Sequence, residues 1–248
     1  MVEIKDLHKS FDEMIVLDGV SLDVKSGQNM VVFGRSGTGK SVLLKCLIRL
    51  MEPESGKISI EKKDVLALNG KELNDLRKDI GFLFQGAALY DSMSVRENLE
   101  FPLIRNFHFS RDEIDERVMK VLDAVDLVEA IDKAPAELSG GMKKRIGLAR
   151  SIITEPKLML YDEPTTGLDP ITAKEISTLI LDLQRAFKMT SIVVTHDLLC
   201  AKIIADYAIV LEDGHIDHQG TIDELLSTED PFLKNFFSDE VIINNGRG

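Results

Sequence analysis

The sequence predicts an α/β fold, and three observations support that prediction. The apolar run at 158–161, "LMLY", ends in two carboxylates, and "SIVV" at 191–194 ends in Thr-His-Asp. Such runs are typical of buried parallel strands with polar groups at their carboxyl ends. A third run at 29–33 leads straight into a glycine-rich loop and a helical pattern. A chain of 248 residues with 44% hydrophobic residues can build the core that this fold requires.

The N-terminal part alternates short β-like runs with polar turns. Strands are predicted at 2–7, 14–24 and 29–33. After the glycine loop, the apolar residues of 42–51 recur at helical spacing until "EPESG" ends the pattern. Two further strands are predicted at 57–60 and 80–85, so that Gln85 stands at a strand end.

From about residue 86 to residue 150 the strand signals disappear and helical patterns dominate, which indicates a helical subdomain. Ser110 and Glu113 form a capping-box pattern ahead of an apolar stripe on one helical face, which we expect to be core. Its members are Ile114, Val118, Val121, Leu122 and Val125. Asp169-Pro170 predicts the start of another helix, and Asp213-Gly214 predicts a hairpin turn within 208–220.

The composition excludes several classes of protein. No window reaches the roughly 18 apolar residues that a membrane span needs, and the first residues lack the apolar core of a signal peptide. We therefore expect a cytosolic protein that reaches a membrane only through a protein partner. A net charge of −12 argues against broad binding to nucleic acid or anionic lipid. Cys46 and Cys200 lie in apolar helical patterns and are expected to be buried thiols without metal or redox chemistry.

The stretch "GRSGTGKS" matches the pattern G-x-x-x-x-G-K-[ST] between a predicted strand and a predicted helix. In this pattern, backbone N–H groups surround phosphate groups. Lys40 would reach the β and γ phosphates, and the Ser41 hydroxyl would coordinate Mg²⁺. The residues predicted to contact nucleotide are Gly34, Arg35, Ser36, Gly37, Thr38, Gly39, Lys40 and Ser41.

Four polar residues at strand ends are candidates for chemistry. Asp162 can take part in the coordination shell of Mg²⁺, while Glu163 polarises the attacking water. The alternative is that both are ordinary solvated residues at a strand end. His196 could bond the γ-phosphate, whereas an isolated histidine is more often structural. Gln85 taken alone is as consistent with an ordinary polar strand end as with a site residue.

A second glycine-rich stretch, "ELSGGMKKRIGLAR" at 137–150, also suits an anion, because a helix N-terminus presents unpaired N–H groups and partial positive charge. The alternative is an ordinary serine-capped helix, which leaves the paired glycines unexplained. For Lys143, Lys144 and Arg145 we expect a solvated basic helix face more than phosphate contacts.

Taken together, "GRSGTGKS", Gln85, "LSGGM", "LMLYDEP", "TTGLD" and "THD" resemble the nucleotide-binding subunits of ABC transporters in order and spacing. The resemblance implies one P-loop nucleotide-binding domain over 1–248, with a small antiparallel β subdomain and the inserted helical subdomain at about 86–150. The C-terminal part of this domain would be a hairpin and a helix at about 207–237. It also implies ATP and Mg²⁺ as cofactors, Gln85 in the metal shell, and Phe11 stacked on adenine. From the sequence alone Phe11 could equally be a core residue.

The same resemblance implies a head-to-tail dimer that forms on ATP, in which the "LSGG" helix of one chain caps the γ-phosphate held by the other. Ser139, Gly140 and Gly141 would act in trans, and Asp169 would position the interface. Separate integral membrane permease subunits would dock on the segment 86–109. Further transporter subunits are additional expected partners. The protein would then lie on the cytoplasmic face of the inner membrane.

The combination of "GRSGTGKSVLLK", "LSGGM" and "GLDPIT" looks like the ATPase subunits of Mla-type phospholipid transporters, with small-solute importers as the alternative. Met142 departs from the commoner "LSGGQ" form. A non-transport ABC ATPase would carry a long coiled coil between its motifs or two cassettes in one chain, and neither is present here. A regulator without turnover conflicts with the intact set of Lys40, Asp162, Glu163 and His196. A guanine-nucleotide switch is disfavoured because the sequence has no N-K-x-D.

Overall fold

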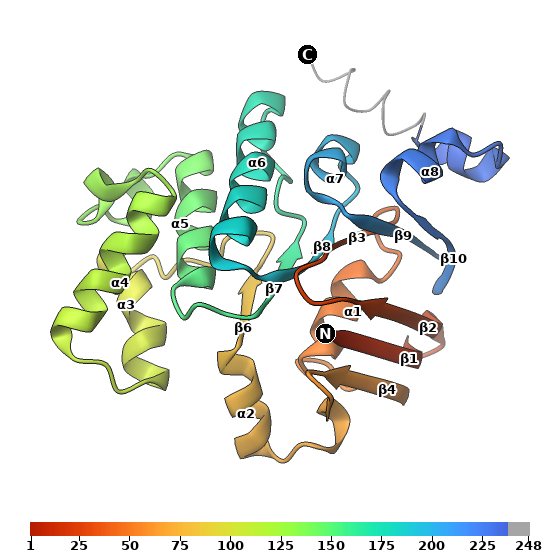
Figure 1. Ribbon diagram of the computed structural model, residues 1–248, viewed down its shortest axis with the longest axis horizontal. Helices are drawn as coiled ribbons and strands as arrows, with labels where there is room; N and C mark the ends of the chain where they lie inside the picture. The colour runs from red at the N-terminus through yellow and green to blue at the C-terminus, as the bar shows by residue number, and fades with distance from the viewer. Residues whose placement is uncertain (238–248) are drawn as a thin grey trace. The chain divides into compact units, whose positions relative to one another are not determined.

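The computed structural model describes residues 1–237, which divide into two units (Figure 1). The first unit combines residues 1–74 with the chain from Thr190 onward, and the second comprises residues 75–189. Elements that are distant in sequence therefore share the first unit. The second is one continuous segment of the chain.

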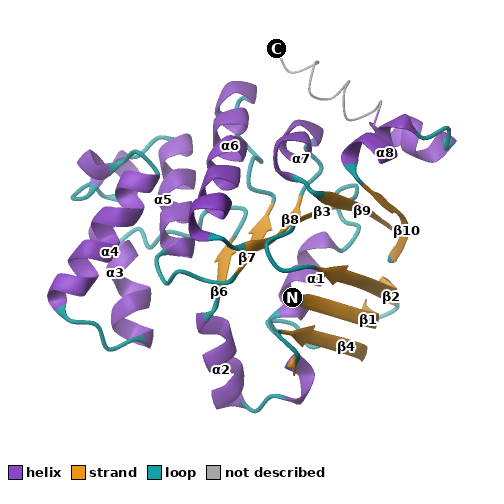
Figure 2. Ribbon diagram, viewed as in Figure 1, coloured by secondary structure: helices purple, strands orange, loops and turns teal. Residues whose placement is uncertain are grey.

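The first unit contains an antiparallel sheet in the order β2-β1-β4-β5 (Figure 2). In β1, Val2, Ile4 and Leu7 are buried and contribute to the core face of the sheet, whereas Glu3 and Lys5 between them are exposed. The strands are β1 (Val2–Phe11), β2 (Met14–Val24), β4 (Ser55–Ile60) and β5 (Lys63–Asp64). This sheet confirms the antiparallel β subdomain that the resemblance implied.

A second set of strands in the same unit is mostly parallel. β3 (Asn29–Phe33) lies parallel to both β8 (Thr190–Val194) and β9 (Tyr207–Glu212), and β10 (His215–Gly220) turns back antiparallel to β9. Every residue of β3 and β8 is buried, as their unbroken apolar runs predicted. The hairpin turns at Asp213-Gly214, where both residues have positive φ. The helices are α1 (Lys40–Leu47), α7 (Leu198–Ile204) and α8 (Ile222–Ser227), with a 3-10 turn at Val65–Ala67.

Helix α1 ends earlier than the apolar run 42–51 suggested. Its last residue is Leu47, and Arg49 adopts a left-handed φ of 51°. The guanidinium of Arg49 donates to the carbonyl groups of Val65 (3.3 Å) and Leu68 (2.8 Å), which compensates for the unfavourable backbone conformation. Apolar spacing alone could not reveal this turn.

The second unit pairs β6 (Ile80–Leu83) with β7 (Leu158–Asp162) in parallel, and the described chain between these two strands contains no other strand. Helices α3, α4 and α5 lie side by side there (Figure 1). The bounds are α3 (Val95–Asn106), α4 (Arg111–Ala124), α5 (Gly140–Ile152) and α6 (Pro170–Phe187), with 3-10 turns at Val128–Ala130 and Pro135–Glu137; α2 (Gly70–Lys78) runs into this unit from the first. The helical character of 86–150 agrees with the prediction, whereas its extent as a subdomain stays a prediction.

Helix α4 begins as its sequence predicted. Ser110 and Glu113 form a reciprocal capping box, and all five residues of the predicted apolar stripe are buried. Cys46 and Cys200 are buried thiols as well, and burial raises the pKa of Cys46 to about 11. None of the helices between residues 1 and 237 combines the length and the apolarity that crossing a membrane requires.

Candidate functional site

The glycine-rich loop joins β3 to α1, and its glycines are required by geometry. Gly37 and Gly39 have φ values of 87° and 95°, which side chains rarely tolerate. A Cβ atom at Gly39 would also lie 2.7 Å from a methyl group of Val16. At Gly34 it would lie 2.6 Å from the carbonyl oxygen of Leu211. The backbone of this loop can therefore turn tightly only with glycine at these positions.

Lys40 is 5% exposed and is the first residue of α1. Its ammonium group donates to the carbonyl oxygens of Gly34 at 2.6 Å and Arg35 at 3.0 Å. Thr38 donates its hydroxyl to the same Arg35 carbonyl at 2.9 Å. The positive charge of Lys40 thus lies against the backbone of the loop, and its contact with the phosphate groups stays a prediction.

His196 follows β8, and the glycine loop follows β3. These strands are parallel neighbours, with Val32 opposite Val194 in the register. His196 is half-buried and the glycine loop leaves the same edge of the sheet, so the structure brings these two predicted elements to one edge of the first unit.

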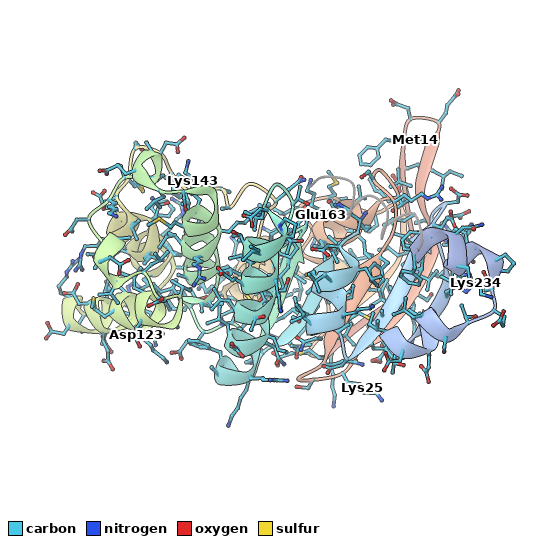
Figure 3. The ribbon with its side chains drawn as sticks, turned by 90° about the horizontal axis from the view of Figure 1, so that it is seen from above. Met14, Lys25, Asp123, Lys143, Glu163 and Lys234 are labelled. Carbon is cyan, nitrogen blue, oxygen red and sulfur yellow. The ribbon has the colours of Figure 1, made fainter. Side chains whose placement is uncertain are left out.

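Phe11 ends β1 with 39% of its surface exposed, and the ammonium of Lys9 lies 5.1 Å from its ring centre. The alternative that Phe11 is a core residue is therefore wrong. Met14, at the tip of the same hairpin, is 63% exposed (Figure 3). A face of Phe11 remains accessible for stacking on a planar ring, and the predicted contact with adenine stays a prediction.

In the second unit the two carboxylates follow β7 as predicted. Asp162 is 6% exposed and Glu163 is 9% exposed, so both are largely withdrawn from water. Glu163 has a left-handed φ of 49°, and its Oε2 accepts a hydrogen bond from the Thr166 hydroxyl at 3.3 Å. A non-glycine residue in this conformation is uncommon and is often found at functional sites.

Gln85 lies two residues beyond β6, and its side chain is exposed. β6 and β7 are parallel, with Leu83 opposite Tyr161, so Gln85 and Glu163 leave neighbouring strands at the same edge. Two of the predicted strand-end residues are therefore brought together in this unit. The role of Gln85 as a site residue stays a prediction.

Lys144 corrects the expectation of a solvated basic helix face. It is 5% exposed, and its ammonium group donates to the backbone carbonyl oxygen of Gln85 at 2.5 Å and to that of Glu163 at 3.4 Å. Burial lowers the pKa of Lys144, while the charges of Asp162 and Glu163 act in the opposite direction. The spacing held a signal for this, because Lys144 shares a helical face with the buried Leu148 and Ile152.

The neighbouring basic residues also differ from that expectation. Arg145 donates to the carbonyl oxygen of Val125 at 3.2 Å and forms an ion pair with Glu175 at 3.2 Å. Lys143 is half-buried (Figure 3). Lys144 and Arg145, which were expected to be solvated, therefore both hold helix α5 against neighbouring segments.

The "LSGG" stretch forms the start of α5. Ser139 is the N-cap, and its hydroxyl accepts a hydrogen bond from the backbone N–H of Met142 at 3.3 Å. Ser139 and Gly140 are exposed, whereas a Cβ atom at Gly141 would lie 3.0 Å from a methyl group of Thr172. The start of this 13-residue helix is thus open to a ligand from outside the unit.

Asp169 caps α6 next to this helix start. Its carboxylate accepts hydrogen bonds from the Thr172 hydroxyl at 2.6 Å and from the N–H groups of Ile171 and Thr172. The Thr172 hydroxyl bond is the main reason that the pKa of Asp169 lies below its usual range. Thr172 therefore contacts Asp169 and lies against Gly141, which places the two predicted interface elements together.

A pocket of about 240 Å³ opens on the second unit. It is lined by segments of β6, α3 and α5 and by the loop before α3. Tyr90 is 44% exposed, and the guanidinium of Arg150 lies 5.6 Å from the centre of its ring. The lining residues are Ile80, Gly81, Phe82, Tyr90, Phe101, Pro102, Asn106, Arg150, Ser151 and Thr154.

Comparison with known proteins agrees with these features. Residues 17–166 match the family model described as ABC transporter. The ATP-binding protein MlaF of an intermembrane phospholipid transport system in Haemophilus influenzae is 38% identical over 97% of this chain and 91% of its own length. A probable ribonucleotide transport ATP-binding protein of Mycobacterium leprae is 39% identical over 96% of this chain and 68% of its own. The methionine import protein MetN 1 of Pseudomonas putida is 36% identical over 99% and 75%.

Solved structures show the same similarity. A dimeric ATP-binding cassette, MJ0796, in a post-hydrolysis state with ADP and phosphate has a TM-score of 0.81 and 32% identity, over 90% of this chain and 99% of its own. CbiO1 of Clostridium perfringens, part of the transporter complex CbiONQ, has a TM-score of 0.84 and 29% identity, over 99% of this chain and 96% of its own. With the glycine loop, the strand-end carboxylates and the "LSGG" helix in place, this chain belongs to the ABC transporter family and is an ATPase of that family.

Proposed function

We propose that the chain binds Mg-ATP and hydrolyses it to drive a separate membrane permease. The glycine loop and Lys40 hold the phosphates, Glu163 orients and deprotonates the attacking water, and His196 contacts the γ-phosphate. The residues proposed to contact the nucleotide are Phe11, Gly34, Arg35, Ser36, Gly37, Thr38, Gly39, Lys40, Ser41, Ser139, Gly140 and Gly141. The match of the family model across the glycine loop and both carboxylates is the main support.

The proposed metal ligands are Ser41, Gln85 and Asp162. They supply hydroxyl, amide and carboxylate oxygen atoms, which is the donor set that Mg²⁺ prefers. The near-complete burial of Asp162 suits a carboxylate that neutralises a cation and not a solvated surface group. Bound Mg²⁺ would offset the negative charge that develops on the transferred phosphoryl group.

The second part of the proposal is a head-to-tail dimer that forms on ATP. The exposed start of α5 at Ser139 and Gly140 would bind the γ-phosphate held by the glycine loop of the other copy. Asp169, linked to this region through Thr172, would position the interface. The dimeric cassettes among the similar structures support this arrangement.

The third part is the partner. We assign the pocket beside Tyr90 and Arg150 as the place where a helix of the permease docks. It opens within the segment 86–109 that was predicted for this contact, and it offers both aromatic rings and a cation. Within that segment, Tyr90 and Phe101 line the pocket, whereas Phe107 stacks on Phe109 and is not among the lining residues. Such docking would hold the protein on the cytoplasmic face of the inner membrane.

The proposed cargo is phospholipid moved between envelope membranes. The motifs "GRSGTGKSVLLK", "LSGGM" and "GLDPIT" support it, and the phospholipid-system relative is consistent with it. Small-solute import is the second candidate, because methionine-import proteins are similar to almost the same degree. The cargo itself would contact the permease and not this chain.

Copurification tests the cargo. The complex should be isolated from native membranes through a tag on this chain, and its permease and extractable lipid identified by mass spectrometry. Phospholipid retained at a fixed ratio to the permease, and lost when the permease is absent, would support lipid transport. A copurified soluble solute-binding protein and no retained lipid would contradict it in favour of solute import.

A further inference from the structure

Lys144 has no role in the function proposed above, yet it is the one buried lysine among residues 75–189. An ammonium group removed from water costs several kcal/mol unless close partners compensate it. At 5% exposure, Lys144 has two backbone carbonyl groups as hydrogen-bond acceptors and two carboxylates near enough to affect its pKa. An apolar residue of similar length would fill the same space without this cost, so stability alone does not explain a lysine here.

The two carbonyl groups belong to Glu163, the proposed base, and to Gln85, a proposed metal ligand. Gln85 follows β6 and Glu163 follows β7, and in both cases the Lys144 bond fixes the peptide just beyond a strand. The orientation of that peptide determines where the side chain points, especially at Glu163 with its left-handed backbone. Lys144 therefore bonds the backbone that carries each of these two side chains.

The backbone after Gln85 needs such support. Ala87 and Ala88 both have positive φ, at 59° and 51°, which is unfavourable for alanine. Helix α5 holds this segment at further points along the face that carries Lys144. Arg150 donates to the carbonyl oxygen of Ala87 at 3.1 Å, and a Cβ atom at Gly147 would lie 2.9 Å from the Ala87 methyl. Of the three α5 residues that contact this segment, Lys144 is the one that also bonds the backbone at the carboxylates.

The same helix begins at Ser139, which the proposed function assigns to the site of the partner copy. Lys144 lies five residues later, on the helix that connects that exposed start with Gln85 and Glu163. We infer that Lys144 is a positioning residue for hydrolysis: it holds the backbones of Gln85 and Glu163 at fixed positions relative to helix α5 of the same chain, whose start carries the "LSGG" stretch. This inference rests on the function proposed above for Gln85, Ser139 and Glu163.

The variant Lys144→Met tests it, with Lys144→Gln as a second variant that retains one donor group. Methionine should preserve folding, because a buried ion replaced by an apolar side chain is often neutral for stability. We expect kcat to fall at least roughly tenfold while KM and the dissociation constant for ATP stay within about threefold, with Lys144→Gln in between. Lys120→Met, which removes an exposed lysine from the same unit, should leave all three unchanged.

Two further measurements separate positioning from general stability. Hydrogen exchange of a peptide covering 85–90 should accelerate at least roughly tenfold in Lys144→Met, with peptides of α4 unaffected. In the Gln85→Ala background, Lys144→Met should lower kcat less than it does in the wild-type chain, because the part of its effect that passes through Gln85 is already lost and only the part through Glu163 remains. Unchanged exchange at 85–90, or effects that multiply fully, would overturn the inference. A wild-type chain that hydrolyses no ATP would instead overturn the proposed function.

Discussion

The guanidinium of Arg150 lies over the ring of Tyr90, 5.6 Å from its centre, and donates a hydrogen bond to the backbone of Ala87 at 3.1 Å. Burial lowers the pKa of Arg150, with the neighbouring tyrosine acting in the opposite direction. One residue therefore contacts both the proposed docking pocket and the segment that follows Gln85. A partner that moves Tyr90 would act on a backbone only a few residues from the proposed active site.

The first prediction concerns this pocket. Replacing Tyr90 or Phe101 by alanine should weaken recruitment to membranes that contain the permease at least roughly tenfold, because the exposed aromatic surface of the pocket is lost. ATPase activity of the isolated protein should stay within about twofold of wild type. Membrane co-sedimentation and a phosphate-release assay measure the two quantities.

Ile104→Ala is the matched control, since Ile104 is 61% exposed on the same helix α3 but does not line the pocket. Its recruitment should equal that of wild type. If Tyr90→Ala and Phe101→Ala bind the membranes normally, the pocket is not the docking site. Joint loss of folding and activity would show that these aromatics serve as core.

The second prediction concerns nucleotide binding. Mg-ATP at a hundred times its dissociation constant should raise the free energy of unfolding by about 2.7 kcal/mol. Lys40→Ala should remove most of that increase, because the ammonium that lies against the loop backbone is lost. Thermal denaturation with and without Mg-ATP measures it. Lys45→Ala, on the same helix, should respond like wild type, and an undiminished shift in Lys40→Ala would contradict the assignment of Lys40.

The third prediction concerns Glu163. Glu163→Gln should retain ATP binding and lower kcat at least roughly a hundredfold, because an amide cannot accept the proton of the attacking water. An ATP-bound dimer should then accumulate and elute earlier in size-exclusion chromatography. Glu129→Gln, at an exposed carboxylate of the same unit, should hydrolyse ATP normally. Wild-type turnover in Glu163→Gln would show that another group acts as the base.

The fourth prediction concerns stability at the loop before α3. Asn98 is fully buried, donates to the carbonyl oxygens of Tyr90, Met93 and Ser94, and accepts from the N–H of Tyr90 at 2.8 Å. Asn98→Ala removes these side-chain hydrogen bonds, including the acceptor of the Tyr90 N–H, and should lower the free energy of unfolding by about 2–3 kcal/mol. Urea denaturation measures it. The exposed Asn106 is the control, since Asn106→Ala should cost less than about 0.5 kcal/mol, and equal costs would contradict this account.

The two-residue β5 was not predicted, and β6 ends at Leu83 and not at Gln85. Local patterns were enough to predict the existence of the other strands, the capping box at Ser110 and the turn at Asp213-Gly214. Each of these depends on residues close in sequence, such as an unbroken apolar run or a turn dipeptide. The glycine loop was predictable for the same reason, because its residues are consecutive. The pairing of strand-end residues needed one general rule, that parallel strands present their carboxyl ends at one edge.

The burial of Lys144 and the early end of α1 depend on contacts across long stretches of chain. Lys144 bonds residues 59 positions before it and 19 after it, and Arg49 bonds carbonyl groups 16 and 19 positions away. Charge composition alone describes both residues as ordinary surface cations. Only the fold shows that their acceptors are backbone carbonyl groups, which leave no trace in side-chain patterns.

In the proposed dimer, each ATP site combines the glycine loop of one copy with the "LSGG" helix of the other. Mixing chains that carry Lys40→Ala with chains that carry Ser139→Arg tests it most directly, since one composite site of each heterodimer loses both elements and the other keeps both. ATPase activity should return, up to roughly a quarter of the wild-type rate after random assortment. Mixing Lys40→Ala with Ser41→Ala should give no recovery, because every site then lacks part of its glycine loop. If the first mixture also stays inactive while both variants still dimerise, or if each variant is active alone, the composite site is contradicted.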